Sequence, residues 1–417
     1  MNILNVFPLP DGIGGSERSA HLGAQALRAA GHSLFLLHGM QGKAGSGEGY
    51  DRVVGIPDIF DRRSIAEPGG VQRSEAKLRA FICTNRIDIL HVQGWPRTAT
   101  LERWAREYAV VATAHVALCP NNARYQWKGR KACDRGIGLG CLTTGFMHKG
   151  CGHLGNGKPY GLPGFVRGMA DDFLLRRAIG HCAGVIAPSR WLKERLVKDG
   201  MSEEIIRVLP PPIAGDAHVS MLTQEQMPPV VTFVGRLVDF KGPDHLLKAS
   251  SLISSPHRVW FIGDGPMRAD LERMAEDLGI GERVTFFGAL PPDQIGDYRL
   301  RSAVLAVPSL LPETFLMVGP EAMLLRRPIV AYRVGGISEW LHDGLNGSLV
   351  EPGDVQGLAK ALEPLLHDQD VRHRMGLAGF ELAKEWVPQK HASALLQCYH
   401  EALDHAKSRQ AGCSGRM

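Results

Sequence analysis

Residues 308–328, PSLLPETFLMVGPEAMLLRRP, place two glutamates eight positions apart across the start of a predicted helix. Pro320 lacks an amide donor and is tolerated only in the first turn of a helix, so the helix begins close to residues 317–319. Glu313 then lies in the loop before the helix, and Glu321 lies one turn inside it. The free backbone amides at this helix start form an anion site and belong to Leu316, Met317 and Val318. The stretch predicts a site for a hydroxyl-rich group beside a phosphate, or else an acidic helix start with solvated carboxylates.

A second stretch, VTFVGRLVDFKGPDHLL at residues 231–247, places two cations beside the end of a predicted strand. The strand ends at Gly235 and Arg236, and Lys241 opens the next helix. Ligands bind at the carboxyl ends of strands in open parallel sheets. A guanidinium can contact two phosphate oxygens at once, and an ammonium adds a mobile point charge. The pair therefore predicts a diphosphate site, with two surface cations as the alternative.

Taken together, the Arg236/Lys241 pair and the Glu-x(7)-Glu spacing of Glu313 and Glu321 resemble the retaining glycosyltransferases of family 4, over most of the chain. The resemblance implies the GT-B fold, an α/β architecture of two Rossmann-like doubly wound domains that face each other across a cleft. It also implies that Glu321 binds ribose hydroxyls and that Glu313, with the amides after it, holds the donor sugar and phosphate. Relatives usually have glycine where this chain has Leu316, so the approach of the sugar is expected to differ there.

Glycine-rich turns add further donor-site candidates. Gly14 and Gly15, in GGSE, follow a predicted strand at residues 3–7, and their spacing is not the dinucleotide pattern G-x-G-x-x-G. GGSE resembles the family's N-terminal glycine loop beside donor phosphate and acceptor, although such a turn can need glycine for steric reasons alone. Gly263, after the predicted strand at residues 259–262, joins the predicted donor-binding residues. Residues 335–339, GGISE, resemble the family's GGxPE turn, with serine in place of proline.

Two histidines fall at the ends of predicted strands in the N-terminal half. His91 ends the strand at residues 87–92, and His115 follows the strand at residues 110–114. His115 matches the family's active-site histidine, which contacts the transferred sugar, so we expect a functional role for His115 and a structural role for His91. Many relatives carry an acidic residue directly after this histidine, where the present chain has Val116.

The length of 417 residues exceeds what one hydrophobic core usually supports, so two domains are predicted. Strands alternate with helices in both halves, which predicts parallel sheets. The expected boundaries are residues 1–215 for an acceptor-side domain, 216–387 for a nucleotide-sugar-binding domain, 388–408 for a helix that returns to the first domain, and 409–417 for a disordered tail.

Composition indicates an ordinary globular protein, with 44% hydrophobic and 22% charged residues. The N-terminus does not read as a signal peptide and no apolar run reaches membrane-spanning length, so we expect a cytoplasmic protein, with a peripheral place at the inner face of the membrane as an option. A net charge of +5 is too small to indicate a nucleic-acid partner.

Residues 119–160 read as a glycine-rich, basic insertion that is too long for a plain connection. Its position just past His115 predicts an acceptor-facing lid, and its charge suits an anionic acceptor or membrane surface, with a solvated loop as the alternative. Its basic residues are Arg124, Lys128, Arg130, Lys131, Arg135, Lys149 and Lys158, against one acid, Asp134. It also holds Cys119, Cys133, Cys141 and Cys151, together with His148 and His153. Structural zinc within residues 119–153 would explain these thiols, as would a redox-labile cluster or four unpaired thiols.

The function that the resemblance implies is transfer of a sugar, with retention, from a nucleotide-diphosphate donor to a hydroxyl of a glycan or lipid-linked acceptor, as in polysaccharide, lipopolysaccharide or glycolipid synthesis. The expected catalytic residues are His115, Arg236, Lys241 and Glu313. No catalytic cofactor and no metal ligand in the site are predicted, because no DxD motif stands out and the two cations can replace Mg²⁺ at the diphosphate. The alternatives are a non-catalytic nucleotide-sugar binder and an epimerase or phosphorylase of the same fold.

Overall fold

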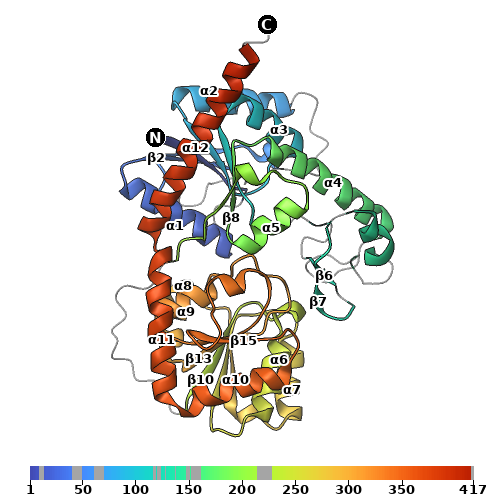
Figure 1. Ribbon diagram of the computed structural model, residues 1–417, viewed down its shortest axis with the longest axis vertical. Coiled ribbons are helices and arrows are strands. Elements are labelled where there is room, and N and C mark those ends of the chain that lie inside the picture. The colour runs from blue at the N-terminus through green and yellow to red at the C-terminus, as the bar shows by residue number, and fades with distance from the viewer. Residues whose placement is uncertain are drawn as a thin grey trace.

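The chain folds into two Rossmann-like α/β domains, each built on one parallel sheet (Figure 1). A computed structural model describes residues 1–8, 14–39, 49–60, 70–115, 119, 124–126, 128–136, 138–146, 151, 161–213 and 228–414. The α/β class and the doubly wound architecture agree with the prediction from the sequence.

The N-terminal domain carries a seven-stranded sheet in the order β3-β2-β1-β4-β5-β8-β9. Its strands are β1 (Asn2–Val6), β2 (Ser33–His38), β3 (Arg52–Gly55), β4 (Ile89–Val92), β5 (Val110–Thr113), β8 (Gly184–Ala187) and β9 (Ile206–Val208). Its helices are α1 (Gly15–Ala29), α2 (Gly70–Thr84), α3 (Thr98–Glu107), α4 (Leu162–Gly180) and α5 (Arg190–Lys198). The central strands β1 and β4 are almost wholly buried, because helices cover both faces of the sheet.

The C-terminal domain carries a six-stranded sheet in the order β12-β11-β10-β13-β14-β15. Its strands are β10 (Val230–Val234), β11 (Arg258–Ile262), β12 (Val284–Gly288), β13 (Val304–Val307), β14 (Ile329–Tyr332) and β15 (Gly347–Val350). Its helices are α6 (Pro243–Leu252), α7 (Arg268–Asp277), α8 (Pro292–Arg301), α9 (Val318–Leu324), α10 (Val355–His367) and α11 (Gln369–Ala383). The strand order reverses direction at β10, so the ends of β10 and β13 flank the topological switch point, where ligands bind in this architecture.

Helix α9 begins where Pro320 requires it to begin. Met317 is the N-cap, and Pro320 occupies the third helical position. The helix also packs tightly, since a side chain at Gly319 would lie 2.2 Å from the ring of Trp340. The predicted start at residues 317–319 is confirmed.

Helix α12 (Pro388–Ser414) returns to the N-terminal domain and packs against α1, as Figure 1 shows. Tyr399 on this helix is fully buried, and Arg409 donates to the carbonyl of His181 at 2.7 Å. Helix α12 continues through Ser414, into the predicted tail at residues 409–417, and Arg409 ties this end of the helix to the first domain. Residues 415–417 and the predicted domain boundary at residue 215 lie outside the described residues.

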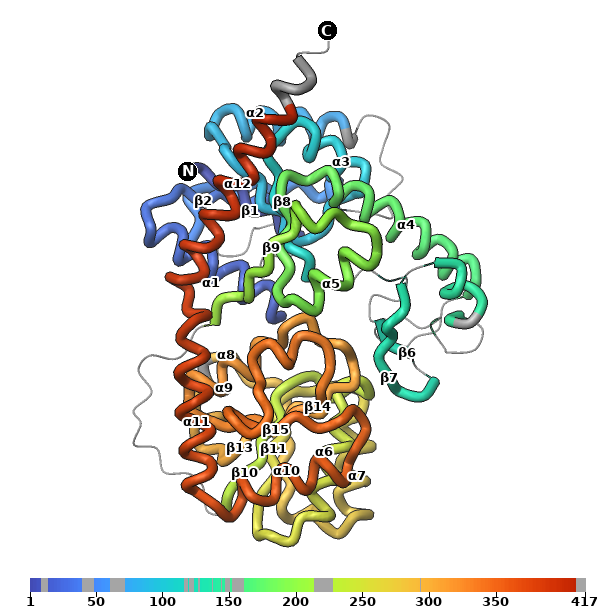
Figure 2. Tube along the Cα trace, viewed as in Figure 1, coloured from blue at the N-terminus to red at the C-terminus, as the bar shows by residue number. Residues whose placement is uncertain are grey.

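The insertion between β5 and α4 contains a small hairpin, β6 (Tyr125–Gln126) and β7 (Lys131–Ala132), and a π-helical turn (Cys141–Phe146). Figure 2 shows the hairpin projecting from the N-terminal domain toward the C-terminal domain. None of the helices within the described ranges is long and apolar enough to cross a membrane.

Candidate active site

A cavity of about 290 Å³, the main cavity, lies between the two domains. Gly15 and His115 line it from the N-terminal domain, and Glu313, Leu316 and Met317 line it from the C-terminal domain. The two walls are close, since a side chain at Gly15 would lie 3.7 Å from the sulfur of Met317. The cleft thus brings together predicted residues from both halves of the chain.

Glu313 and Lys241 form an ion pair at the C-terminal wall. Nζ of Lys241 lies 2.6 Å from Oε1 of Glu313, although the two residues are 72 positions apart in the chain. The hydroxyl of Ser309 donates to the same oxygen at 2.6 Å. The pair is largely buried, with side-chain exposures of 18% for Lys241 and 11% for Glu313, so it is weakly screened by salt.

The GGISE turn packs against the backbone of the loop that carries Glu313. The amide of Gly336 donates to the carbonyl of Glu313 at 2.6 Å. Gly335 has φ +56, and a side chain on it would lie 2.1 Å from that carbonyl. Only glycine fits at residue 335, which gives this predicted motif a physical reason.

Gly235 and Gly263 pack against each other at the ends of neighbouring strands. A side chain at Gly263 would lie 2.0 Å from the carbonyl oxygen of Gly235. Neither glycine lines the main cavity, and neither do Gly14, Arg236 and Glu321. Lys241 and Val318 line a smaller neighbouring cavity, which shares Leu316 with the main one.

Arg236 is exposed, and its guanidinium lies 5.7 Å from the centre of the Phe240 ring. Stacking on an aromatic ring restricts the side chain while leaving its N–H groups for another partner. This arrangement suits an arginine that binds a phosphate at the strand end.

Glu321 is 5% exposed and lies between two arginines. Its Oε1 is 3.1 Å from Nη1 of Arg18 on α1, and its Oε2 is 2.8 Å from Nη2 of Arg299 on α8. The sequence analysis missed both partners. Arg18 directly follows GGSE in the sequence, which is a usable signal, whereas Arg299 belongs to no recognisable motif. The carboxylate is held in place from both domains rather than solvated.

His115 lies on the opposite wall of the cavity. Burial lowers its pKa to about 4, against the opposing effects of Glu17 and a hydrogen bond with the Gln93 backbone, so the imidazole is neutral near pH 7. Its Nε2 is buried and has no hydrogen-bond partner among the described residues. The hydroxyl of Thr314, next to Glu313, donates to the carbonyl of His115 at 3.2 Å. A neutral ring nitrogen is therefore left for a ligand in the cavity.

His91 differs from His115 in that both of its ring nitrogens have partners. Nε2 lies 2.7 Å from the Thr113 hydroxyl, and Nδ1 lies 2.7 Å from the Tyr399 hydroxyl on α12. Burial lowers the pKa of His91 to about 3. These contacts fit the structural role expected for it.

Leu316 has φ +66, a left-handed conformation that is rare for a residue with a side chain. The strain explains in physical terms why glycine would be favoured at this position. Because Leu316 lines both cavities, its side chain also narrows the space beside Lys241 and Glu313.

None of the described residues of the insertion lines the main cavity, and the acceptor-facing lid stays a prediction. Two of its basic side chains are also turned inward. Arg124 is buried in an ion pair with Asp199, and Arg130 pairs with Asp239 and Asp244 of the other domain. These two arginines are therefore unavailable to an anionic acceptor or membrane. His148, His153, Lys149, Lys158 and Val116 lie outside the described residues.

The cysteines of the insertion line one small cavity together with Phe165; they are Cys119, Cys133, Cys141 and Cys151. Within the described ranges, no group of three or more histidine, cysteine, aspartate or glutamate side chains is arranged to hold a metal ion. The thiols thus gather in one place without forming a ready coordination site.

Comparison with known proteins identifies relatives that match about half of the chain. The D-inositol 3-phosphate glycosyltransferase of Nocardia farcinica is 37% identical over 201 residues, which cover 45% of this chain and 44% of that protein. The 2-deoxystreptamine glucosyltransferase of Streptomyces kanamyceticus is 30% identical over 251 residues, which cover 56% of this chain and 63% of that protein. The matches span roughly half the length of these relatives.

Solved structures share the fold at low sequence identity. Anabaena HepE in complex with UDP and glucose has a TM-score of 0.68 and 19% identity, covering 95% of this chain and 98% of that one. A glycosyltransferase from Rickettsia africae has a TM-score of 0.71 and 16% identity, covering 96% and 98%. Family models described as "Glycosyl transferase 4-like domain" and "Glycosyl transferases group 1" match residues 14–212 and 220–381. The two matches together extend over most of the chain, and the protein therefore belongs to the group 1 glycosyltransferases of family 4, with the GT-B fold.

Proposed function

We propose that the protein transfers a sugar, with retention, from a nucleotide-diphosphate donor to a hydroxyl group of an acceptor. The observation that carries the proposal is that Glu313, paired with Lys241, lines the same interdomain cavity as His115, whose buried Nε2 has no hydrogen-bond partner among the described residues. A carboxylate and a neutral imidazole then line one cavity, and the cation paired with the carboxylate lines the neighbouring cavity, which shares Leu316. This is what a site needs in order to stabilise a departing diphosphate and exclude water.

In the proposed mechanism, Arg236 and Lys241 bind the donor diphosphate and stabilise the negative charge that develops as the bond between sugar and phosphate breaks. Glu313 and the backbone amides of residues 316–318 orient the sugar, and Glu321, held by Arg18 and Arg299, receives the ribose hydroxyls. The acceptor hydroxyl attacks the same face that the phosphate leaves. Its proton passes to a departing phosphate oxygen, so no covalent intermediate with the protein forms. Neutral His115 contacts the sugar hydroxyls, and we expect turnover without a divalent metal, since the two cations supply the positive charge.

The acceptor proposed from the sequence is a glycan or a lipid-linked glycan, as used in polysaccharide, lipopolysaccharide or glycolipid synthesis. The names of the matched relatives add D-inositol 3-phosphate and 2-deoxystreptamine as compounds to test. The acceptor panel should therefore contain small polyhydroxylated rings beside lipid-linked glycans.

Peripheral membrane contact is also proposed, because helix α4 exposes both apolar and basic side chains. Leu162, Val166 and Phe173 on this helix are 49%, 47% and 61% exposed, and Arg167 and Arg177 are exposed on the same helix. Apolar and basic side chains together favour an anionic lipid surface. Sedimentation with phosphatidylglycerol vesicles tests this, since equal recovery of the wild-type and Phe173→Ser proteins in the pellet would contradict a role for this helix.

A structural zinc ion in residues 119–153 is proposed because four thiols line one cavity in a segment with little core of its own. Zinc binding would draw these thiols closer together than they are now, because the described side chains form no ready site.

The experiment that tests the function combines product analysis with His115→Ala. The wild-type protein is incubated with UDP-, GDP- and ADP-sugars and the acceptor panel, and products are identified by mass spectrometry. A glycosyltransferase gives an acceptor-dependent product, and His115→Ala loses turnover while it still binds the nucleotide. A non-catalytic binder gives no product with either protein. An acceptor-independent change in the sugar would indicate an epimerase, and dependence on orthophosphate would indicate a phosphorylase.

A further inference from the structure

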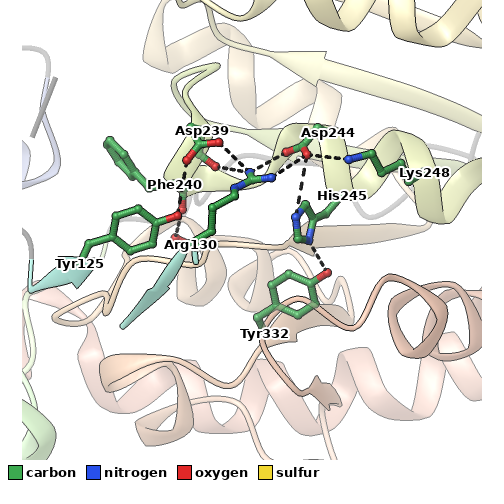
Figure 3. A network of polar contacts seen from close by, with 9 residues as sticks. Tyr125, Arg130, Asp239, Phe240, Asp244, His245, Lys248 and Tyr332 are labelled. Atoms are coloured by element: carbon green, nitrogen blue, oxygen red, sulfur yellow. Dashed lines mark hydrogen bonds and ion pairs between the residues drawn. The ribbon is translucent and has the colours of Figure 1, made fainter. Parts of the chain in front are cut away.

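The hairpin β6–β7 belongs to the N-terminal domain in sequence, but its tip packs on the C-terminal domain at the 3-10 turn Asp239–Lys241 (Figure 3). Tyr125 is fully buried in the hydrophobic core of the C-terminal domain. Its ring meets that of Phe240 edge to face, with centres 6.4 Å apart, and its hydroxyl lies 3.4 Å from the Asp239 carboxylate. The turn that carries Lys241 is thus held from the other domain.

Arg130 forms the polar half of this contact. Its two terminal nitrogens each lie 3.0 Å from an oxygen of Asp244, and Nη2 also donates to the carbonyl of Asp239 at 3.0 Å. The Asp239 carboxylate is 2.9 Å away. Burial alone would raise the pKa of Asp244, but the hydrogen bonds and charge of Arg130 outweigh it and hold that pKa at about 2. A two-point contact with a buried carboxylate fixes orientation better than an exposed ion pair does.

The base of the hairpin is fixed to its own domain. Arg124 and Asp199, both buried, form an ion pair at the end of α5. Arg195 and Lys198 on α5 each donate to the carbonyl of Asp134 at 2.9 Å. The hairpin is therefore anchored at both ends and works as a brace between the domains.

The braced turn supports both cations of the donor site. Lys241 is its last residue, and Phe240 within it carries the stacked guanidinium of Arg236. The turn is also tightly packed, since a side chain at Gly242, whose φ is +65, would lie 2.1 Å from the carbonyl of Pro308. A shift of the turn would displace Lys241 and Arg236 together.

We propose that Arg130 and Tyr125 are positioning residues for the donor site. They hold the Asp239–Lys241 turn, and through it Lys241 and Arg236, in the orientation that meets the donor diphosphate. The proposal rests on the proposed function for the identity of the ligand, but the brace itself is a separate physical claim. Displacements near 1 Å are enough to cost roughly a hundredfold in a preorganised site, so a brace of this kind has a measurable effect.

The test compares Arg130→Met with Lys128→Met, since both remove one positive charge from the same turn of the hairpin and Lys128 is exposed. Binding of UDP, GDP and ADP is measured by calorimetry, and hydrogen exchange is followed in peptides that cover residues 236–242. For Arg130→Met we expect nucleotide binding to weaken roughly tenfold and exchange in these peptides to accelerate. Lys128→Met should match the wild-type protein in both measurements.

Arg130→Lys keeps the charge but not the two-point contact, so its nucleotide affinity should lie between those of the wild-type and Arg130→Met proteins. It also replaces Arg130→Met in the test if that variant does not fold. Unchanged exchange in both Arg130 variants would overturn the brace. Faster exchange with unchanged nucleotide affinity would overturn the positioning role. A wild-type protein that binds none of UDP, GDP and ADP would instead overturn the proposed function, and the positioning role with it, while the exchange data still report on the brace.

Discussion

The side chain of Thr314 donates a hydrogen bond to the backbone of His115 across the boundary between the domains. Thr314 directly follows Glu313, so the loop that carries one predicted donor-binding carboxylate is attached to the residue expected to contact the transferred sugar. The relative placement of donor loop and histidine is therefore built into the fold.

Chelation of divalent metal should leave turnover intact, because Arg236 and Lys241 supply the positive charge that the diphosphate needs. The measurement is product formation with and without EDTA. Complete loss that Mg²⁺ restores would contradict the role assigned to these two residues. Loss that only Zn²⁺ restores would point to the cysteine-rich insertion instead.

The protein with glycine at position 316 should be more stable than the protein with alanine there, although a change from alanine to glycine usually lowers stability. Both substitutions remove the leucine side chain, but only glycine adopts φ +66 without strain. We expect Leu316→Gly to exceed Leu316→Ala in free energy of unfolding by about 1 kcal/mol. Urea denaturation of the two variants checks this, and a more stable alanine variant would contradict the strain at this residue.

Acidification should destabilise the protein between about pH 6.5 and pH 4. Burial lowers the pKa of His91 to about 3 and that of His115 to about 4, so in this range the unfolded chain binds protons that the folded chain does not. Stability is then full above pH 6.5 and falls by about 1.4 kcal/mol per pH unit for each such histidine.

The control for this pH dependence is His91→Gln, measured by urea denaturation at several pH values. The variant loses the contact with Tyr399 and should be less stable at pH 7.5, but its stability should depend less steeply on pH. Parallel curves for the wild-type and His91→Gln proteins would show that His91 is not neutral in the folded state.

Protein purified without a histidine tag should contain about one zinc ion per chain, if the four thiols of the insertion bind metal. Cys133→Ser should lose the zinc and unfold at a lower temperature. Cys83→Ser, at an exposed position on α2, should keep both properties of the wild-type protein. Elemental analysis that finds no zinc in the wild-type protein would leave the cysteines as free thiols.

Much of the fold and part of the site could be predicted because their determinants are local. Pro320 sets the start of α9, and Asp354 caps α10, where its side chain accepts from the amide of Gly357. The glycines at residues 235, 263 and 335 lie at strand ends and turns where close backbone contacts can be anticipated. Local rules were sufficient for these features.

The contacts between the domains could not be predicted in the same way. Arg130 and Asp244 are 114 positions apart, and nothing in the hairpin sequence indicates which domain its tip will contact. Position in the chain does not set the direction in which a loop leaves its domain, so the contact of Arg130 with the carbonyl of Asp239 had no signal in the sequence. Likewise, no local pattern in the sequence indicates that Arg18 and Arg299 pair with Glu321.

Calorimetric titration of the nucleotide sugars into the wild-type protein and into Arg236→Met/Lys241→Met tests the central claim most directly. Both substitutions keep the aliphatic part of each side chain, and circular dichroism verifies that the variant is folded. We predict that the wild-type protein binds at least one nucleotide sugar. The variant loses two charged contacts with the diphosphate, so its affinity for that nucleotide sugar should be lower by roughly a hundredfold or more. Equal affinity of the two proteins for a nucleotide sugar would show that these cations do not hold the diphosphate, and the proposed site would be wrong.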